Sequence, residues 1–423
     1  MRLATANMHN QAVENITAKQ VDITRQQGKV SSGQRVERAS DDPISAARAE
    51  RALNRITQLQ AEQRALDAQR DSLTVAESTL GSAGGLLQRF RELLVQAGNA
   101  TNTGSDRTTL ANEMRSIREQ LLALANTKDA NGNALFGGLE IAKVQGVASE
   151  AFTTTGAEPN LVYQFNGTPG QNSPTQSAVP YTMDGNAIFM QVPKGNGYYD
   201  VTLGAANTGQ ISTDIGQFST TPAGGAITTS YQISFAMTGT PAVATYTVDT
   251  VPPTVPLGTG TFVSGQPISF TDTAPAPDVN IALTVYGTPA AGDTVAIAPY
   301  TLGNPATDSL FGLLDDAING ITGASSKAPA LAQAVAQGLT HVDSSLDKIQ
   351  AARGQAGQWL NRADTVTGLN ETVAGQLESD RSNAQDLDMA AGISNLQQLT
   401  TGYQAALQSY AKIQGLSLFD YIR

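Results

Sequence analysis

Two adjacent carboxylates, Asp41 and Asp42, stand beside a proline and among several arginines in the stretch SSGQRVERASDDPISAARAE, residues 31–50. Paired carboxylates can serve as a general acid and a general base. Such a site also needs a nucleophile with a histidine, a metal cluster or a glycine-rich phosphate loop, and the neighbouring sequence supplies none of these. In the structural alternative, Asp42 caps a helix whose first residue is Pro43, and Asp41 places negative charge at the positive end of the helix dipole. The residue types favour the structural interpretation.

Other residues that could carry chemistry are scarce. The chain of 423 residues has no cysteine, which excludes disulfides, iron–sulfur clusters and thiol nucleophiles. It has only two histidines, His9 and His341, which argues against a histidine-rich metal site, and we interpret both as helix-seam or surface residues. The sequence therefore predicts no catalytic residue, no metal site and no cofactor.

The distribution of charge excludes further classes of protein. The net charge is -11, and residues 1–140 carry 17 Lys and Arg against 16 Asp and Glu, residues 141–305 carry 2 against 9, and residues 306–423 carry 7 against 12. No zone is basic, so nucleic acid is not the expected partner. No run approaches the roughly 20 apolar residues of a membrane span, and the N-terminus lacks the apolar centre of a secretory signal. We expect no membrane insertion and, if the protein leaves the cell, a route without a cleaved signal.

Composition divides the chain into three zones. Residues 1–139 are rich in helix formers and contain one proline, residues 140–303 are rich in Thr, Gly, Pro, Val and Tyr in short strand-like runs, and the helical composition returns from about residue 304. This order predicts an α+β multidomain fold, in which a coiled-coil domain of long helices is built from both chain ends and an all-β domain is inserted. The expected parts are an assembly helix and loop at 1–43, a helical hairpin at 44–139, the inserted outer domain at 140–303 and the completing helices at 304–423.

Leucines repeat every seven residues in the first helical zone. They are Leu59, Leu66, Leu73, Leu80, Leu87 and Leu94, with Ala76, Ala83, Phe90 and Ala97 on the complementary positions. The C-terminal zone has matching three-and-four spacing, including Leu339, Val342, Leu346, Ile349, Ala356, Leu360, Ala363, Val366, Leu369, Val373, Leu377, Leu396, Leu399, Tyr403, Leu407 and Tyr410. Two such stripes from opposite ends of the chain can bury each other.

The two ends of the chain carry weaker patterns. Polar residues interrupt the heptads of the first 30 positions, so we expect this segment and the extreme C-terminus to fold only against other subunits. The ending GLSLFDYIR concentrates apolar side chains where frayed polar residues are usual, which predicts docking through Leu416, Leu418, Phe419 and Tyr421. Arg35 and Arg38, beside the carboxylate pair, are candidates for contacts with a neighbouring subunit.

Residues 31–49 resemble the N-terminal signature of the flagellin superfamily, and the DDP in this stretch is similar to that of the hook-associated proteins. The C-terminal half agrees: Arg353, Gly357, Asn361 and Arg362 resemble an R-x-x-x-G-x-x-x-N-R pattern, and Asp386 and Asp388 fall in a D-x-D-x-A element. The ending QGLSLFDYI also resembles a hook-associated protein. The resemblance covers the two helical zones, about 250 residues.

The resemblance implies a non-enzymatic structural adaptor of the bacterial flagellum that joins hook to filament. The implied partners are further copies of the chain in a ring, hook-associated protein one, flagellin, the flagellar type III export apparatus and a cytoplasmic export chaperone. It also implies secretion, with the terminal helices in inner coiled-coil layers and the middle domain outside.

Flagellin itself is the alternative within the class. A leucine-zipper regulator is disfavoured because residues 34–70 hold seven Arg against six acidic residues, without the excess of a DNA-binding basic region. The third alternative is an enzyme with an appended coiled coil, which a cofactor or metal bound in a defined pocket would favour.

Overall fold

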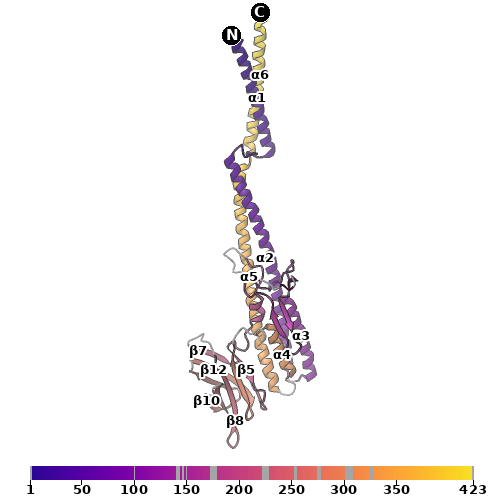
Figure 1. The fold of residues 1–423 in the computed structure, drawn as a ribbon, viewed down its shortest axis with the longest axis vertical. Helices are drawn as coiled ribbons and strands as arrows, with labels where there is room; N and C mark the ends of the chain where they lie inside the picture. The colour runs from indigo at the N-terminus through magenta and orange to yellow at the C-terminus, as the bar shows by residue number, and fades with distance from the viewer. Residues whose placement is uncertain are drawn as a thin grey trace. The chain divides into compact units, whose positions relative to one another are not determined.

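A computed structural model describes residues 2–99, 101–139, 143–144, 147–148, 150–171, 179–221, 228–251, 255–273, 278–300, 308–323 and 328–421. Helices occupy both ends of the chain and strands occupy the middle, which confirms the predicted α+β architecture (Figure 1). The chain divides into two compact units: unit 1 consists of residues 1–67 and 364–423, and unit 2 consists of residues 68–363. Unit 1 is therefore built from segments at opposite ends of the chain.

Six helices make up the helical part of the described chain. They are α1 (Arg2–Ser32), α2 (Pro43–Ala97), α3 (Gly104–Ala125), α4 (Leu310–Gly323), α5 (Ala328–Gln385) and α6 (Met389–Tyr421). Capping residues fix two of the starts: Asp42 precedes α2, and Thr103 and Asp106 form a reciprocal capping box at the start of α3. The α2 and α5 helices are long enough to contribute to both units.

The strands are short and pair antiparallel throughout the described middle region. They are β1 (Lys143–Val144), β2 (Val147–Ala148), β3 (Phe152–Thr155), β4 (Val162–Phe165), β5 (Tyr199–Leu203), β6 (Gln210–Thr213), β7 (Gln217–Thr221), β8 (Ser230–Thr238), β9 (Val243–Val251), β10 (Pro256–Thr261), β11 (Pro267–Asp272), β12 (Asp278–Thr288) and β13 (Thr294–Pro299), with one π-helical turn, η1 (Asn186–Met190).

Two of the sheets share one hydrophobic core. One sheet has the order β10-β9-β8-β13-β5, and the other has β11-β12-β6 with β7 also paired to β12. Alternate residues of β11, β12 and β13 are buried, as expected for strands with one face on a core. The buried carboxylate of Asp293 holds the turn before β13, because it accepts hydrogen bonds from the backbone N–H groups of Thr208, Gly209 and Ala290 at 2.8 to 3.0 Å.

The leucine stripe of α2 is the buried seam that its spacing predicts. All ten predicted positions from Leu59 to Ala97 are buried, each with at most 5% of its surface exposed. Within unit 2 the facing helix is α5, since Arg91 pairs with Asp343 and Arg353 pairs with Glu77 in an antiparallel order. The two stripes thus bury each other there, as the pattern predicts.

The prediction is wrong for part of the C-terminal stripe. Leu369, Val373 and Leu407 are 62%, 37% and 40% exposed, although their spacing assigns them to a seam. The physical reason is that unit 1 is a thin assembly of paired helices, and a helix with one neighbour can bury only one face. Heptad spacing shows that a side chain needs a partner, but not whether the partner belongs to the same chain.

Candidate functional site

Two turns from opposite ends of the chain meet in unit 1: the α1–α2 loop (residues 33–42) and the α5–α6 link (residues 386–388). The Arg35 N–H donates to the Gln385 carbonyl at 2.8 Å, and the Leu387 N–H donates to the Gly33 carbonyl at 2.8 Å. Gln34 and Asp386 form an antiparallel bridge between them. Gly33 has a φ of 72°, a conformation that other residues rarely adopt, so it allows the loop to turn here. We call this meeting point the loop–link junction.

Asp42 caps α2, as the sequence predicts. Its Oδ1 accepts a hydrogen bond from the Ser45 N–H at 3.1 Å, and Pro43 occupies the first helical position. The hydrogen bonds from Ser45, assisted by Arg35, lower the pKa of Asp42 to about 2. The carboxylate is therefore ionised across the physiological range. A group that is already charged and occupied in this way is not a general acid.

Asp41 and Arg38 close the turn that precedes the cap. The Asp41 carboxylate accepts from the Arg38 N–H at 3.2 Å, and the Asp41 N–H donates to the Arg38 carbonyl at 2.9 Å. Asp41 thus shapes the loop in addition to placing charge near the start of α2. The Arg38 side chain lines a groove of about 510 Å³ together with residues of α1, among them Thr24 and Lys29.

Arg35 spans the loop–link junction from one side to the other. Its Nη1 lies 3.3 Å from Asp42 Oδ2, and its Nη2 donates to Ser45 Oγ at 3.2 Å and to the Ala384 carbonyl at 2.8 Å. It therefore connects the start of α2 with the end of α5. The sequence made Arg35 a candidate for contacts with a neighbouring subunit, and these contacts within the chain were not predicted.

The other half of the junction has a cap of its own. Asp388 Oδ1 accepts from the N–H groups of Ala390 and Ala391 at 3.0 and 3.1 Å, so it caps α6 as Asp42 caps α2. The Asp386 side chain is exposed. Two residues that the sequence reasoning missed complete the junction: Ser45 binds both Asp42 and Arg35, and Val36 is buried with 5% exposure. The spacing of Asp42 and Ser45, three residues apart across a proline, is the signal that could have identified Ser45.

The remaining predicted interface residues lie elsewhere. Arg353 belongs to unit 2, where it makes two hydrogen bonds to Glu77 Oε1 at 3.0 and 2.6 Å. Asn361 and Arg362 also lie on α5 in unit 2 and form no part of the junction. The side chains of four predicted docking residues near the C-terminus fall outside the described part of the structure, which gives only their helical backbone: Leu416, Leu418, Phe419 and Tyr421.

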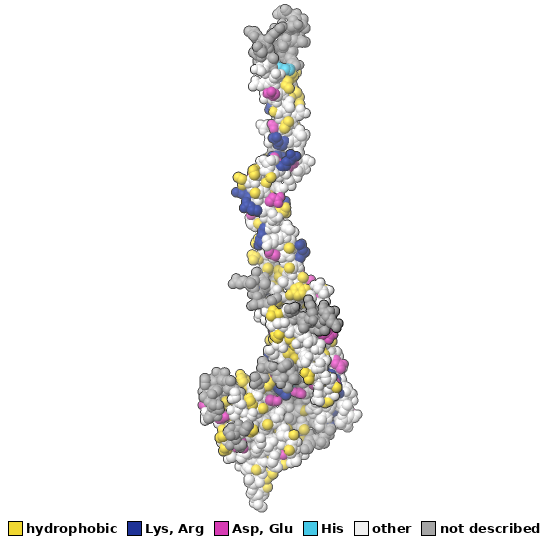
Figure 2. Space-filling view, in the orientation of Figure 1, with side chains coloured by type: hydrophobic (Ala, Val, Ile, Leu, Met, Phe, Trp, Pro, Cys, Tyr) yellow, Lys and Arg dark blue, Asp and Glu magenta, His cyan; other side chains and the backbone are white. Residues whose placement is uncertain are grey.

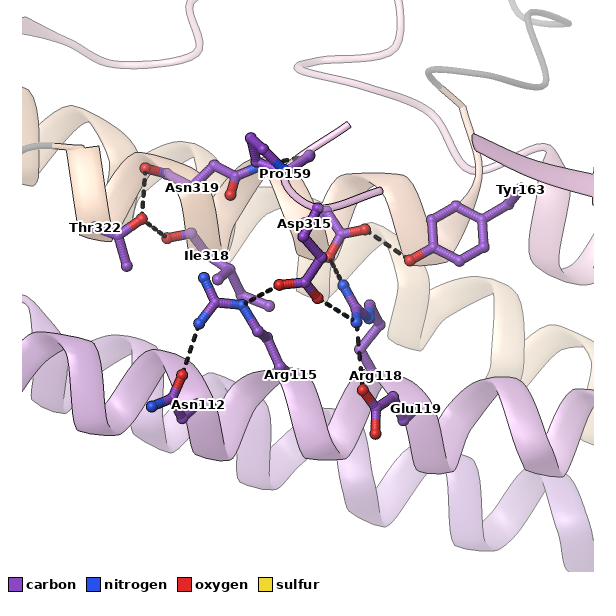
Figure 3. Close-up of polar contacts among 11 residues, drawn as sticks. Asn112, Arg115, Arg118, Glu119, Pro159, Tyr163, Asp315, Ile318, Asn319 and Thr322 are labelled. Atoms are coloured by element: carbon purple, nitrogen blue, oxygen red, sulfur yellow. Dashed lines mark hydrogen bonds and ion pairs between the residues drawn. The ribbon is translucent and has the colours of Figure 1, made fainter. Parts of the chain in front are cut away.

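A buried charge network in unit 2 was not foreseen from the sequence (Figure 3). Arg118 on α3 is 5% exposed and hydrogen-bonds to Asp315 on α4 and, at 2.9 Å, to Glu158. The Tyr163 hydroxyl donates to the second oxygen of Asp315 at 2.6 Å, and Arg115 pairs with Glu158 at 3.0 Å. Burial, followed by the hydrogen bond to Asp315, raises the pKa of Tyr163. The network joins α3, α4 and the β3–β4 hairpin, and its charged groups are paired with one another.

Two further structural tests concern ligands and membranes. Over the residues that the structure describes, no three His, Asp or Glu side chains come together in a way that would hold a metal ion. No helix in the same ranges combines the length and the apolar character needed to cross a bilayer.

Comparison with known proteins points to the flagellum. Residues 3–140 match the bacterial flagellin N-terminal helical region. A stretch of 142 residues is 34% identical to flagellar hook-associated protein 3 of Salmonella typhimurium, and covers 33% of this chain and 44% of that protein. The chain thus spans less than half the length of this curated relative.

Solved structures extend the likeness to most of the chain. Flagellar hook associated protein-3 from Legionella pneumophila superposes with a TM-score of 0.65 at 27% identity, over 79% of this chain and 99% of that one. The flagellar junction protein from the same organism gives a TM-score of 0.62 at 25% identity, over 75% and 98%. The resemblance to the flagellin superfamily and its hook-associated proteins, predicted from the motifs, is confirmed.

Proposed function

Because residues 3–140 form a flagellin-type N-terminal helical region, we propose that this protein is a non-enzymatic structural component of the bacterial flagellum. The observation that carries the proposal is the uncovered apolar surface of unit 1. Ile44, Leu369 and Ile393 are 68%, 62% and 43% exposed on helices drawn from both chain ends. Figure 2 shows hydrophobic and basic side chains together on the visible face of this helical part. Apolar helix surfaces of this kind are usually buried against other helices.

The specific role that we propose is an adaptor between hook and filament, since the relatives are named as hook-associated and junction proteins. In this role the protein forms a ring with further copies of itself and contacts hook-associated protein one on one side and flagellin on the other. The β-rich middle domain faces outward. Export through the flagellar type III apparatus, with a cytoplasmic chaperone, places the protein outside the cell at the hook–filament junction.

Within this proposal the loop–link junction is an assembly site. Its caps at Asp42 and Asp388 and the Arg35 bridge fix where the helices of unit 1 start and end, so a neighbouring subunit meets a defined surface. Arg38 and Asp41, which line one exposed groove, are proposed contacts with a neighbour. The same role is proposed for Arg353, Asn361 and Arg362 and for the apolar C-terminal residues.

Flagellin is the second candidate, because the matched N-terminal region is one that filament subunits possess. Deletion of the gene distinguishes the two. Loss of a junction protein leaves hooks that shed flagellin monomers into the medium, whereas loss of a filament subunit leaves no flagellin to shed. A deletion strain with full-length filaments and normal motility would refute both roles.

A variant tests the assembly site directly. Asp42→Ala combined with Pro43→Ala removes the cap and the preformed first turn of α2, and incorporation into flagella should fall while export into the medium continues. The measurement is an immunoblot of sheared flagella against culture supernatant. Unchanged incorporation would show that the junction has no part in assembly.

A further inference from the structure

A groove of about 680 Å³ runs along the start of α2 and the end of α5 within unit 1. Three arginines line it, Arg35, Arg48 and Arg51, against a single carboxylate, Asp380. Leu377 on α5 adds apolar surface to the lining. The groove therefore suits a short acidic segment, and we call it the arginine groove.

Arg48 and Arg51 are the two arginines of the groove that have no carboxylate partner among the residues described. Arg35 is occupied at the loop–link junction by Asp42, Ser45 and the Ala384 carbonyl. Arg51 donates only from Nε, to the Ala47 carbonyl one turn earlier. Both Arg48 and Arg51 are exposed, and neither has a carboxylate within 4.0 Å in the described ranges. A guanidinium presents a planar fork of donors that fits a carboxylate, so two adjacent unused forks favour an acidic partner.

The α5–α6 link has the complementary chemistry. It reads Asp386, Leu387, Asp388, and both carboxylates are exposed with no basic group within 4.0 Å among the residues described. Asp388 caps α6 through one oxygen, Oδ1, so that its Oδ2 takes no part in the cap. The two carboxylates of the link equal the two arginines of the groove in number and carry the opposite charge.

The link cannot enter the groove of its own chain. Its backbone is tied to the α1–α2 loop by the hydrogen bonds from Arg35 N–H to Gln385 and from Leu387 N–H to Gly33. The link of a second copy is tied in the same way to its own α1–α2 loop, but that copy can move as a whole and bring its link to the groove. A contact between two different surfaces of identical chains is heterologous, and repeated around an axis it closes a ring or builds a helix.

We propose that the α5–α6 link of one copy docks in the arginine groove of the next, with Asp386 and Asp388 facing Arg48 and Arg51. This inference rests on the proposed function, because it describes how neighbouring copies meet in the flagellum. It assigns a partner to Arg48, which lies within the signature-like stretch 31–49, and to Arg51, which lies beyond it.

Disulfide trapping tests the contact, because the chain has no cysteine of its own. A strain that lacks the native gene expresses two copies, one with Arg51→Cys and one with Asp386→Cys, and its flagella are oxidised with copper phenanthroline. A dimer on a non-reducing gel is expected for this pair. Arg64→Cys with Asp386→Cys is the matched control, because Arg64 is also exposed on α2 but does not line the groove, and it should give no dimer. Strains with each single cysteine exclude pairing between like copies.

Charge reversal gives an independent readout. Arg48→Glu with Arg51→Glu should lower incorporation into flagella by roughly tenfold or more, as expected when close charge pairs across an interface become repulsive. Adding Asp386→Arg to the same chain should recover part of the loss, and Arg64→Glu should have no effect. Circular dichroism of the purified full chain checks that the helices persist.

The outcomes separate this inference from the proposed function. Normal incorporation of the charge-reversed variant would overturn the docking of the link in the arginine groove. Reduced incorporation without the 51–386 dimer would also overturn it, because another segment would then occupy the groove. Neither result affects the flagellar role. Absence of the wild-type protein from purified flagella would instead refute the role itself.

Discussion

Acidification should destabilise unit 2 through His341 on α5. Its side chain is only 4% exposed, and its Nδ1 has no hydrogen-bond partner within the described structure. Burial, the larger cause, and the positive charge of Lys194 lower the pKa of His341 to about 4 from an ordinary 6.5. Asp316 and Asp200, which both pair with Lys194 at 3.4 Å, and a hydrogen bond to the Leu313 backbone act in the opposite direction without restoring it.

The sign of the effect follows from which state takes up the proton first. The folded-state pKa lies below the unfolded value, so between them the unfolded chain binds more protons. The stability that the neutral ring contributes is complete above pH 6.5 and is lost as pH falls toward about 4. With about 1.4 kcal/mol per pKa unit, the full interval from 6.5 to about 4 corresponds to about 3.5 kcal/mol of unfolding free energy.

This loss is measured by urea unfolding at about pH 7.5 and about pH 4.5, monitored through the fluorescence of Trp359. Trp359 is the only tryptophan and lies half-buried on α5 in unit 2. In His341→Gln the side chain cannot gain a proton, so the decrease between the two pH values should be about 2.5 kcal/mol smaller than in the wild type. His9→Gln, at an exposed position in unit 1, is the control and should keep the wild-type decrease. The same decrease in His341→Gln as in the wild type would refute the reasoning.

Further substitutions test the packing of unit 2. A Cβ at Gly320 would lie 2.7 Å from the Ala334 Cβ, so Gly320→Ala should cost about 1–3 kcal/mol in thermal denaturation. Gly354→Ala, where an added carbon meets nothing within 4 Å, should stabilise by up to about 1 kcal/mol, and equal effects at both sites would contradict the packing argument. Arg118→Met strands the buried Asp315 carboxylate and should cost about 3–5 kcal/mol in chemical denaturation, whereas adding Asp315→Leu should recover most of it. A double variant as unstable as the single one would show that the charge is not the cause.

Local patterns in the sequence predicted those features that depend on neighbours along the chain. The seven-residue spacing from Leu59 to Leu94 predicted a buried seam, because a helix places such positions on one face. Asp42 before Pro43 predicted a cap, because both requirements of a helix start fall on adjacent residues. The change to β-branched, glycine-rich runs predicted the inserted strands for the same reason.

Such local patterns could not predict features that join positions far apart in the sequence. Arg118 and Asp315 are 197 residues apart, and on their own helices each resembles an ordinary surface charge. The same holds for Arg35, whose shortest side-chain hydrogen bond is to the Ala384 carbonyl, 349 positions away. A carbonyl at the end of a helix has no signature in the sequence, since every residue possesses one.

The discontinuity of unit 1 has a consequence for the order of events at the ribosome. Roughly 300 residues separate its N-terminal segment, which ends at Asp67, from its C-terminal segment, which begins at Asp364. At a translation rate of about 5–20 residues per second, on the order of 15 to 60 s pass between synthesis of the N-terminal helices and synthesis of the segment with which they pair. An isolated helix of this kind exchanges with unfolded chain. Translation itself therefore provides an interval in which the β-rich middle of unit 2 can fold before the C-terminal partner of the N-terminal helices has been made.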